Sequence, residues 1–325
     1  MIGTLTTSAA LAGAGLWVRR RTAARRAEAE SAFPPIGRVI DVGGINVHAY
    51  TEGSGPDLVL IHGASGNVRD FTFGLTARLR DHYRVTAFDR PGLGWSGRAH
   101  STHDRTFTTA AESPAEQAAL LQAASDHLGL KHPIVVGHSY GGAVALAWGL
   151  SRPADTAALV LLSAVSNPWP GGLGALYAIA GSALGGAFVL PLLSALVPAS
   201  YVEASITDIF APQPAPPGYG AHVGAALSIR THAMRANARQ VNTLRRHIVD
   251  MAPKYSQLKM PLEIVHGQSD TIVPFDIHAA PLSKQAPGAH LTALPGVGHM
   301  PHHVAQDAVL EAIHRAARRS RDAHE

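Results

Sequence analysis

Short apolar runs alternate with longer segments of mixed polarity along most of the chain. Asp57–Ile61, Pro133–Val136 and Ala157–Leu162 are such runs. Apolar stretches of this length are typical of strands buried on both faces of a sheet. Residues 68–80 and 114–128 predict helices, the second of which begins at Pro114. The alternation predicts βαβ units and therefore an α/β fold with a mostly parallel central sheet flanked by helices.

The start of the globular part follows a different pattern. Arg38–Val42 and Ile45–Thr51 flank Gly43-Gly44, and two glycines suit a tight hairpin because both positions accept positive φ. We therefore expect an antiparallel hairpin at one edge of the sheet, followed by a strand at Arg84–Phe88.

The alternation stops near Asn167. Residues 167–250 are rich in Gly, Ala and Pro and include the apolar stretch Leu173–Val197. Pro191 interrupts that stretch, which favours packed helices over a second membrane helix. These residues are expected to form a helical cap inserted into the core.

Strands and helices alternate again after the insertion. Strands are expected at Pro261–Val265 and His290–Leu294, with helices near residues 276–285 and 304–318. The predicted organisation is a leader at residues 1–30, a first part of the core at 31–166, the cap at 167–250, and a second part of the core at 251–325.

The leader has an uneven distribution of charge. Residues 2–18 contain no charged side chain, and five arginines follow, Arg19, Arg20, Arg21, Arg25 and Arg26. A secretory signal carries its positive charge before the apolar run, whereas positive charge after the run is typical of a membrane anchor with its arginines in the cytoplasm. We expect membrane association through residues 2–18, with the catalytic part on the cytoplasmic side. The alternatives are a flexible or surface-lying leader and a soluble cytoplasmic protein.

Composition excludes several classes of site. The net charge of +4 comes mostly from the leader, so no surface for nucleic acid is expected. The chain has no cysteine, which excludes disulfides, cysteine-ligated zinc and a cysteine nucleophile. The 19 histidines show no His-Glu-x-x-His spacing, and the adjacent His302 and His303 cannot form a ligand pair on one helix face. No metal site is therefore predicted.

The segment Gly137-His138-Ser139-Tyr140-Gly141 lies between a predicted strand and an apolar helix. In that setting Gly-x-Ser-x-Gly forces the serine into a strained turn and lifts its Oγ above the sheet. The glycines are needed because side chains would collide in so tight a bend. Ser139 is the predicted nucleophile, and the alternative is an ordinary glycine turn.

A serine hydroxyl needs a base within hydrogen-bond reach, and the base needs an acid that fixes its tautomer. Asp270 lies just beyond one predicted strand, and His299 lies in the loop after the next. Both positions are at the carboxyl ends of parallel strands, on the side of Ser139. We therefore predict a triad of Ser139, Asp270 and His299.

Other residues could take two of these roles. Asp276 is the nearest alternative acid, and His302 and His303 are alternative bases. The segment after the preceding strand, residues 162–167, contains no carboxylate, which favours Asp270.

An oxyanion hole needs two backbone N–H groups aimed at the developing charge. One is expected from Tyr140, directly after the nucleophile, with help from the positive end of the helix. The other is expected from Ala64, in the loop His62–Gly66 after the early buried strand. The alternative for that loop is a plain strand-to-helix turn.

Together these motifs resemble the α/β-hydrolase family over roughly residues 36–320. His62-Gly63, the run Phe88–Ser96, the Ser139 turn and Gly298-His299 match the family pattern in order and spacing. The run Phe88–Ser96 looks like a loop of cap-bearing members such as epoxide hydrolases and haloalkane dehalogenases. The resemblance implies that Asp89 and Arg90 hold this loop by hydrogen bonds and are not catalytic.

The nucleophile in those two groups is Asp, whereas this chain has Ser139. The resemblance therefore implies the serine branch, and we predict a carboxylesterase-like enzyme that forms an acyl-enzyme without metal or organic cofactor. The apolar composition of the cap favours a small-molecule ester with an apolar acyl or alcohol group. The alternatives are a C–C bond hydrolase, a lactonase or a cofactor-free perhydrolase on the same triad, and a non-catalytic binding protein. The sequence predicts neither the substrate nor the oligomeric state.

Overall fold

The computed structural model describes residues 2–322, and the side chains of residues 11–322. Within these residues, eight strands form one sheet in the order β1-β2-β4-β3-β5-β6-β7-β8. Only the β1–β2 and β2–β4 pairs of this sheet are antiparallel, which confirms the mostly parallel sheet and the hairpin at its edge. The strands are β1 (Arg38–Val42), β2 (Ile45–Glu52), β3 (Asp57–Ile61), β4 (Arg84–Phe88), β5 (Ile134–His138), β6 (Ala158–Leu162), β7 (Leu262–Gly267) and β8 (Ala289–Leu294).

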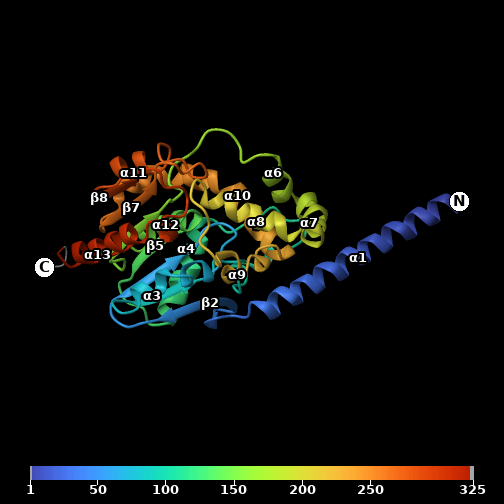
Figure 1. Ribbon diagram of the computed structural model, residues 1–325, viewed down its shortest axis with the longest axis horizontal. Helices are drawn as coiled ribbons and strands as arrows, with labels where there is room; N and C mark the ends of the chain where they lie inside the picture. The colour runs from blue at the N-terminus through green and yellow to red at the C-terminus, as the bar shows by residue number, and fades with distance from the viewer. Residues whose placement is uncertain (1, 323–325) are drawn as a thin grey trace.

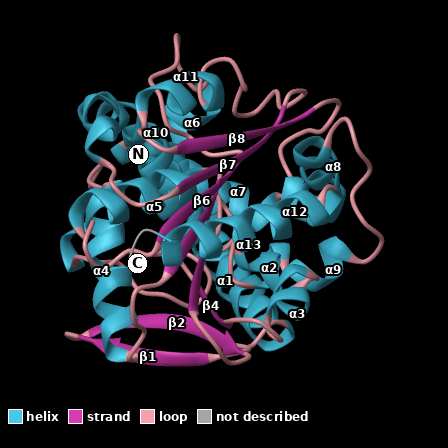
Figure 2. Cartoon of the chain, turned by 90° about the vertical axis from the view of Figure 1, so that its left-hand side faces the viewer, coloured by secondary structure: helices cyan, strands magenta, loops and turns pink. Residues whose placement is uncertain are grey.

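Helices cover both faces of the sheet. Successive side chains of a strand point to opposite faces, so each central strand contributes to two cores. Val59 and Ile61 of β3 pack on the side of α4 (Pro114–His127) and α5 (Tyr140–Ser151), together with α11 (Ala279–Gln285). Leu58 and Leu60 pack on the other side, against α3 (Leu75–Leu79) and α13 (Gln306–Asp322). Figure 2 shows α4 and α5 on one side of the sheet and α3 and α13 on the other.

Two predicted helices are interrupted in the structure. The helix expected at residues 68–80 is split into α2 (Arg69–Thr72) and α3, because Gly74 between them is extended with φ −176°. The last helix begins earlier than expected, as the short α12 (Pro301–Val304), and continues as α13. These differences leave the order of the core elements as predicted.

The cap lies between β6 and β7 in the chain. Its helices are α6 (Ala175–Gly181), α7 (Leu190–Leu196), α8 (Ala199–Phe210), α9 (Tyr219–Val223) and α10 (Thr231–Met251). The apolar stretch is broken between Gly181 and Gly185 and not at Pro191, because a π-helical turn at Gly185–Val189 runs directly into α7. Leu244 and Ile248 near the end of α10 pack in the same core as α4 and α5, which fixes the cap to the sheet.

The leader forms one helix, α1 (Ile2–Ala32), that extends away from the body of the molecule (Figure 1). By length and hydropathy, no individual helix within residues 2–322 qualifies as a membrane span. The expected anchor at residues 2–18 therefore gains no support from the helix that contains it. One pair of helical segments, Ala175–Gly181 and Gly185–Leu196, passes the same test together but is bent by 89°.

Candidate active site

Ser139 sits at the sharp turn between β5 and α5. Its φ of 53° and ψ of −118° lie in a region that residues with a Cβ rarely adopt. The turn is so tight that its glycines have no room for a side chain. A Cβ at Gly137 would collide with the carbonyl oxygen of Gly141, and a Cβ at Gly141 would collide with the carbonyl oxygen of Ile61. The Ser139 N–H donates to the carbonyl of Leu162 at 2.9 Å, which ties the turn to the end of β6. The local sequence thus fixes the serine in a strained position at the carboxyl end of the sheet.

Asp270 and His299 lie together beyond the carboxyl ends of β7 and β8. His299 Nδ1 is 2.7 Å from Asp270 Oδ2, and both side chains are buried. The N–H groups of Ile272 and Val273 each donate to Asp270 Oδ1 at 2.9 Å, which orients the carboxylate. The structure therefore brings this predicted pair into direct contact.

The environment of Asp270 favours its charged form. Burial acts to raise the pKa of this carboxyl, but hydrogen bonds with His266 and His299 outweigh burial and hold the pKa well below its usual range. His266 Nε2 lies 3.4 Å from Asp270 Oδ2 and was not singled out from the sequence. A carboxylate that stays ionised can stabilise a positive charge on His299.

The loop that carries His299 is attached to the strand that carries Ser139. His138 Nε2 is 3.0 Å from the carbonyl oxygen of His299, and the two imidazole rings are 4.9 Å apart between centroids. Among the described contacts there is no hydrogen bond between the Ser139 hydroxyl and the His299 ring. The three predicted residues are thus gathered at one end of the sheet, with only the Asp270–His299 pair hydrogen-bonded.

The loop after β3 lies directly against Ser139. A Cβ added to Gly63 would be 3.1 Å from the Cβ of Ser139, so the next residue, Ala64, is close to Ser139. Arg90 Nη2 donates to the Gly63 carbonyl at 3.0 Å, and the Ser65 N–H donates to Asn237 Oδ1 of α10 at 2.8 Å. In the described structure, neither the Ala64 N–H nor the Tyr140 N–H donates to another residue. Both predicted donors therefore remain available near Ser139.

Asp89 and Arg90 act as the framework of the neighbouring loop. Asp89 accepts hydrogen bonds from the N–H groups of Val68 and Trp95 at 2.8 and 2.7 Å, and lies 2.7 Å from His48 Nδ1. Arg90 is fully buried, and burial lowers its pKa to about 10. Its Nη1 donates to Gln117 and Gln240 at 2.9 and 3.1 Å. These contacts agree with the loop-holding role that the resemblance implies.

The alternative site residues occupy different surroundings. Asp276 is exposed, in the turn before α11. His302 and His303 both point to one buried carboxylate, that of Asp70 in α2, with Nε2 at 3.1 Å from Oδ2 and 2.8 Å from Oδ1 respectively. The two histidines share this partner although they are adjacent, because each meets a different oxygen.

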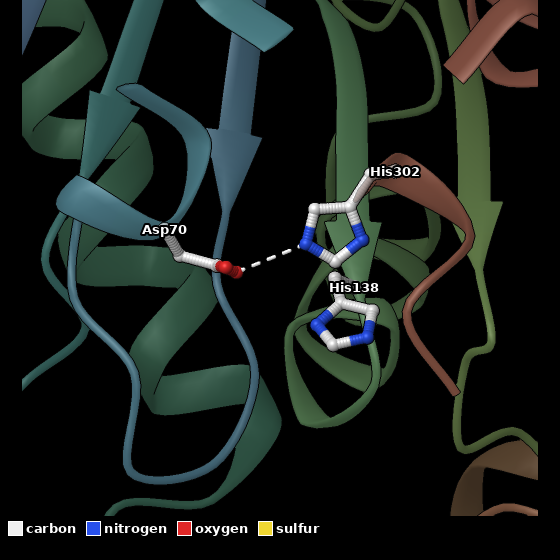
Figure 3. A group of neighbouring side chains, drawn as sticks. All are labelled: Asp70, His138 and His302. Carbon is white, nitrogen blue, oxygen red and sulfur yellow. Dashed lines mark hydrogen bonds and ion pairs between the residues drawn. The ribbon is translucent and has the colours of Figure 1, made fainter. Parts of the chain in front are cut away.

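The Asp70 cluster was not predicted from the sequence. Figure 3 shows Asp70, His138 and His302 converging from three separate elements. One ligand atom from each lies within 4.8 Å of the others, a spacing that could hold a metal ion. The carboxylate already accepts a hydrogen bond from the Tyr219 hydroxyl at 2.8 Å in addition to its contacts with the two histidines. These hydrogen bonds join α2, α12 and the cap, whereas His138 Nδ1 is buried and has no hydrogen-bond partner among the described residues.

This cluster also affects the charge of its members. Burial acts to raise the pKa of Asp70, but the nearby His302 and His303 hold it well below its usual range. Burial and the neighbouring His303 lower the pKa of His302 to about 4. The cluster therefore holds an ionised carboxylate and a neutral His302 near neutral pH.

The fold and these residues define an α/β hydrolase. The family model described as "Alpha/beta hydrolase family" matches residues 58–312, which is most of the chain. This chain belongs to the α/β-hydrolase family.

The chain is similar to two named hydrolases. The chain is 33% identical over 132 residues to 2-hydroxy-6-oxo-2,4-heptadienoate hydrolase of Pseudomonas putida, a match covering 40% of this chain and 45% of that enzyme. It is 25% identical over 292 residues to 2-(acetamidomethylene)succinate hydrolase of Mesorhizobium japonicum, covering 86% of this chain and 94% of that enzyme. The chain thus spans less than half of the Pseudomonas relative and most of the Mesorhizobium one.

Solved structures share the fold. An α/β-hydrolase fold protein from Burkholderia ambifaria aligns with a TM-score of 0.67 at 24% identity, over 85% of this chain and 98% of that one. An esterase from Exiguobacterium antarcticum aligns with a TM-score of 0.66 at 19% identity, over 86% and 98%.

Proposed function

We propose that this chain is a serine hydrolase that cleaves carboxylic esters through an acyl-enzyme intermediate. The observation that carries the proposal is the buried contact of 2.7 Å between His299 Nδ1 and Asp270, beside the strained turn of Ser139. An imidazole that donates from Nδ1 to a carboxylate keeps a free electron pair at Nε2, as a general base requires.

The reaction follows from the arrangement of these groups. His299 Nε2 takes the Ser139 proton as Oγ attacks the ester carbonyl, and the N–H groups of Ala64 and Tyr140 stabilise the oxyanion. The alcohol leaves with the proton from His299, and water activated by the same ring releases the acid. Asp270 stabilises the imidazolium in both steps. No metal or organic cofactor takes part in this scheme.

The proton transfer requires the Ser139 hydroxyl to reach His299, a contact that the described structure lacks. Catalytic hydrogen bonds are often long without substrate and tighten in the complex. The contact between His138 and the His299 carbonyl supports the proposal because it limits how far the base can lie from the turn.

An apolar acyl or alcohol group is the proposed substrate type. Residues 157–202, from β6 through α7 to the start of α8, contain no Asp, Glu, Lys, Arg or His. This first part of the cap offers no charge to pair with a charged substrate group, whereas α10 carries several arginines.

A C–C bond hydrolase is the second candidate, and it would use the same three residues. The relative named 2-hydroxy-6-oxo-2,4-heptadienoate hydrolase supports it, because a 6-oxodienoate contains no ester bond. A lactonase or a cofactor-free perhydrolase would also keep the triad. Purified protein assayed with p-nitrophenyl esters, lactones and 6-oxodienoates would rank these activities.

Replacing Ser139 with alanine tests the nucleophile. Ser139→Ala should lower kcat/KM for a p-nitrophenyl ester by at least about 1,000-fold and abolish labelling by a fluorophosphonate probe. The matched control is Ser163→Ala, since Ser163 is a buried serine with φ 43° just after β6. Because both substitutions keep a Cβ, backbone strain is unchanged in each. Substantial hydrolysis or labelling in Ser139→Ala would remove Ser139 from its proposed role.

A further inference from the structure

Exposed large apolar side chains are concentrated at one end of the molecule. The segment 175–196, which contains α6 and α7, exposes six of them by 45–67%: Leu176, Ile179, Leu184, Phe188, Leu192 and Leu196. Helix α1 adds Leu11, Leu16 and Trp17, exposed by 50–69%. Elsewhere in residues 11–322, apart from the neighbouring Phe107, Leu173 and Tyr201, such exposure occurs at Val39, Val249 and Ile272.

The cap segment lacks the polar face of an ordinary surface helix. A helix on the surface of a soluble domain carries charged or polar residues on its outer side. Residues 175–196 have no charged side chain, and their outer side presents leucine, isoleucine and phenylalanine. Contiguous apolar surface of this kind marks an interaction site.

Positive charge borders the apolar residues of α1. Arg19, Arg20 and Arg21 follow Trp17 and Val18 directly and are exposed. The first acidic residue of the chain is Glu28. Apolar side chains next to a row of arginines are suited to the bilayer interface. The apolar groups can contact acyl chains while the arginines contact anionic headgroups.

Direct contacts hold α1 against the cap. Arg25 Nη1 donates to the Ser194 carbonyl of α7 at 2.9 Å, and Glu30 forms an ion pair of 2.9 Å with Arg230. A cavity of about 520 Å³ lies between α1 and the cap. It is lined by Ala29 of α1, by Val197 just before α8 and by Val202 within α8. Figure 1 shows α1, α6 and α7 at the same end of the molecule, opposite the C-terminus. The two apolar groups therefore belong to one side of the protein.

We propose that residues 11–21 of α1 and residues 175–196 of the cap together form a docking surface for a lipid bilayer with anionic headgroups. The bend of 89° within the cap segment suits a pair of helices lying in the headgroup region, rather than one crossing the bilayer. This inference goes beyond the proposed ester hydrolysis and does not depend on it.

Charge favours a bilayer over a second copy of the chain. In a symmetric dimer the same surface patch meets itself. Residues 11–21 and 175–196 contain no Asp or Glu, so a second copy would offer these arginines no acidic partner. Anionic lipid supplies that partner at the headgroups.

Vesicle flotation of the full-length protein tests the docking surface. The protein should float with phosphatidylcholine vesicles that contain phosphatidylglycerol, and less with phosphatidylcholine alone. The double variant Leu184→Asp/Phe188→Asp should lower the bound fraction at least about tenfold, because it places two charges in the apolar face. The matched control is Val249→Asp, an exposed apolar position outside the surface. Replacing Arg19, Arg20 and Arg21 with glutamate should remove the preference for anionic vesicles.

Several results would overturn the inference. Unchanged vesicle binding in the double variant would exclude the cap, and absence of binding by the wild type would exclude the bilayer altogether. If sedimentation instead shows a wild-type dimer that Leu184→Asp/Phe188→Asp dissociates, the surface belongs to a second copy. Circular dichroism of each variant separates lost binding from lost folding, and it does so without reference to hydrolysis.

Discussion

Ser139 holds a backbone conformation that costs about 1–3 kcal/mol in a residue with a side chain. The surroundings maintain it through glycines on both sides and the hydrogen bond from Ser139 to Leu162. The strain has a use in the proposed mechanism, because it presents the hydroxyl on the side of the sheet where the β7 and β8 loops carry Asp270 and His299.

Substituting Asp270 should lower kcat far more than substituting Asp276, the alternative acid. Asp270→Asn is expected to lower kcat by about 10⁴-fold, since an amide at this position stabilises the wrong imidazole tautomer. Asp276→Asn should leave kcat unchanged because Asp276 is exposed. Steady-state kinetics on a p-nitrophenyl ester would compare the two. Equal losses in both variants would contradict the assignment of the acid.

At the level of single residues, the sequence predicts those that are marked by their order in the chain and by local motifs. It does not predict contacts that only the tertiary structure creates. Asp270 could be placed because it follows a recognisable buried strand, and His299 because it lies in the loop after the next predicted strand, which is the half-exposed edge strand β8. The Asp70 cluster could not, since its members come from α2, β5 and α12 and no local pattern links them. The partnership of His266 with Asp270 was missed for the same reason.

The bounds of elements with a strong apolar pattern were predicted closely. The breaks and the exposure of elements that depend on contacts with other parts of the chain were not. The strands of the parallel sheet fall within a few residues of the expected ranges. The helix expected at 68–80 breaks at Gly74, where the backbone passes close to Gln306 of α13. The apolar run 173–197 was expected to be packed, yet much of its outer side is exposed. A run of leucine and alanine looks the same in sequence whether or not another surface covers it.

The turn between β5 and α5 should not tolerate a single added methyl group. Gly141→Ala would place a Cβ against the carbonyl oxygens of Ile61 and His62, so β3 and α5 would have to separate. We expect the free energy of unfolding to fall by at least about 2 kcal/mol. Gly172→Ala, a cap position with nothing within 4 Å, should have little effect. Urea unfolding monitored by circular dichroism would compare them, and equal stability would argue against the close approach.

The molecule as a whole keeps several histidines neutral in its interior. Burial lowers the pKa values of His62, His278 and His302 to about 4 in each case. A histidine in an unfolded chain titrates near pH 6.5. Between about pH 6.5 and pH 4 the unfolded chain therefore binds more protons than the folded one, and acid favours unfolding.

The free energy of unfolding should thus be lower at pH 5 than at pH 7, by an amount on the order of 2 kcal/mol for each such histidine. Urea titrations at the two pH values measure this change. His278→Gln should reduce it by removing one buried titrating group, whereas replacing the exposed His127 should not. A stability that does not vary between pH 7 and pH 5 would contradict the burial of neutral imidazoles.

The insertion of the cap between β6 and β7 has a consequence for biosynthesis. The ribosome completes β5 and its serine well before it reaches β7 and β8, whose loops carry Asp270 and His299. During that interval β6 is an open edge, and the nascent polypeptide holds the proposed nucleophile without its proposed base. In the proposed mechanism, prematurely terminated translation products would therefore be inert toward esters.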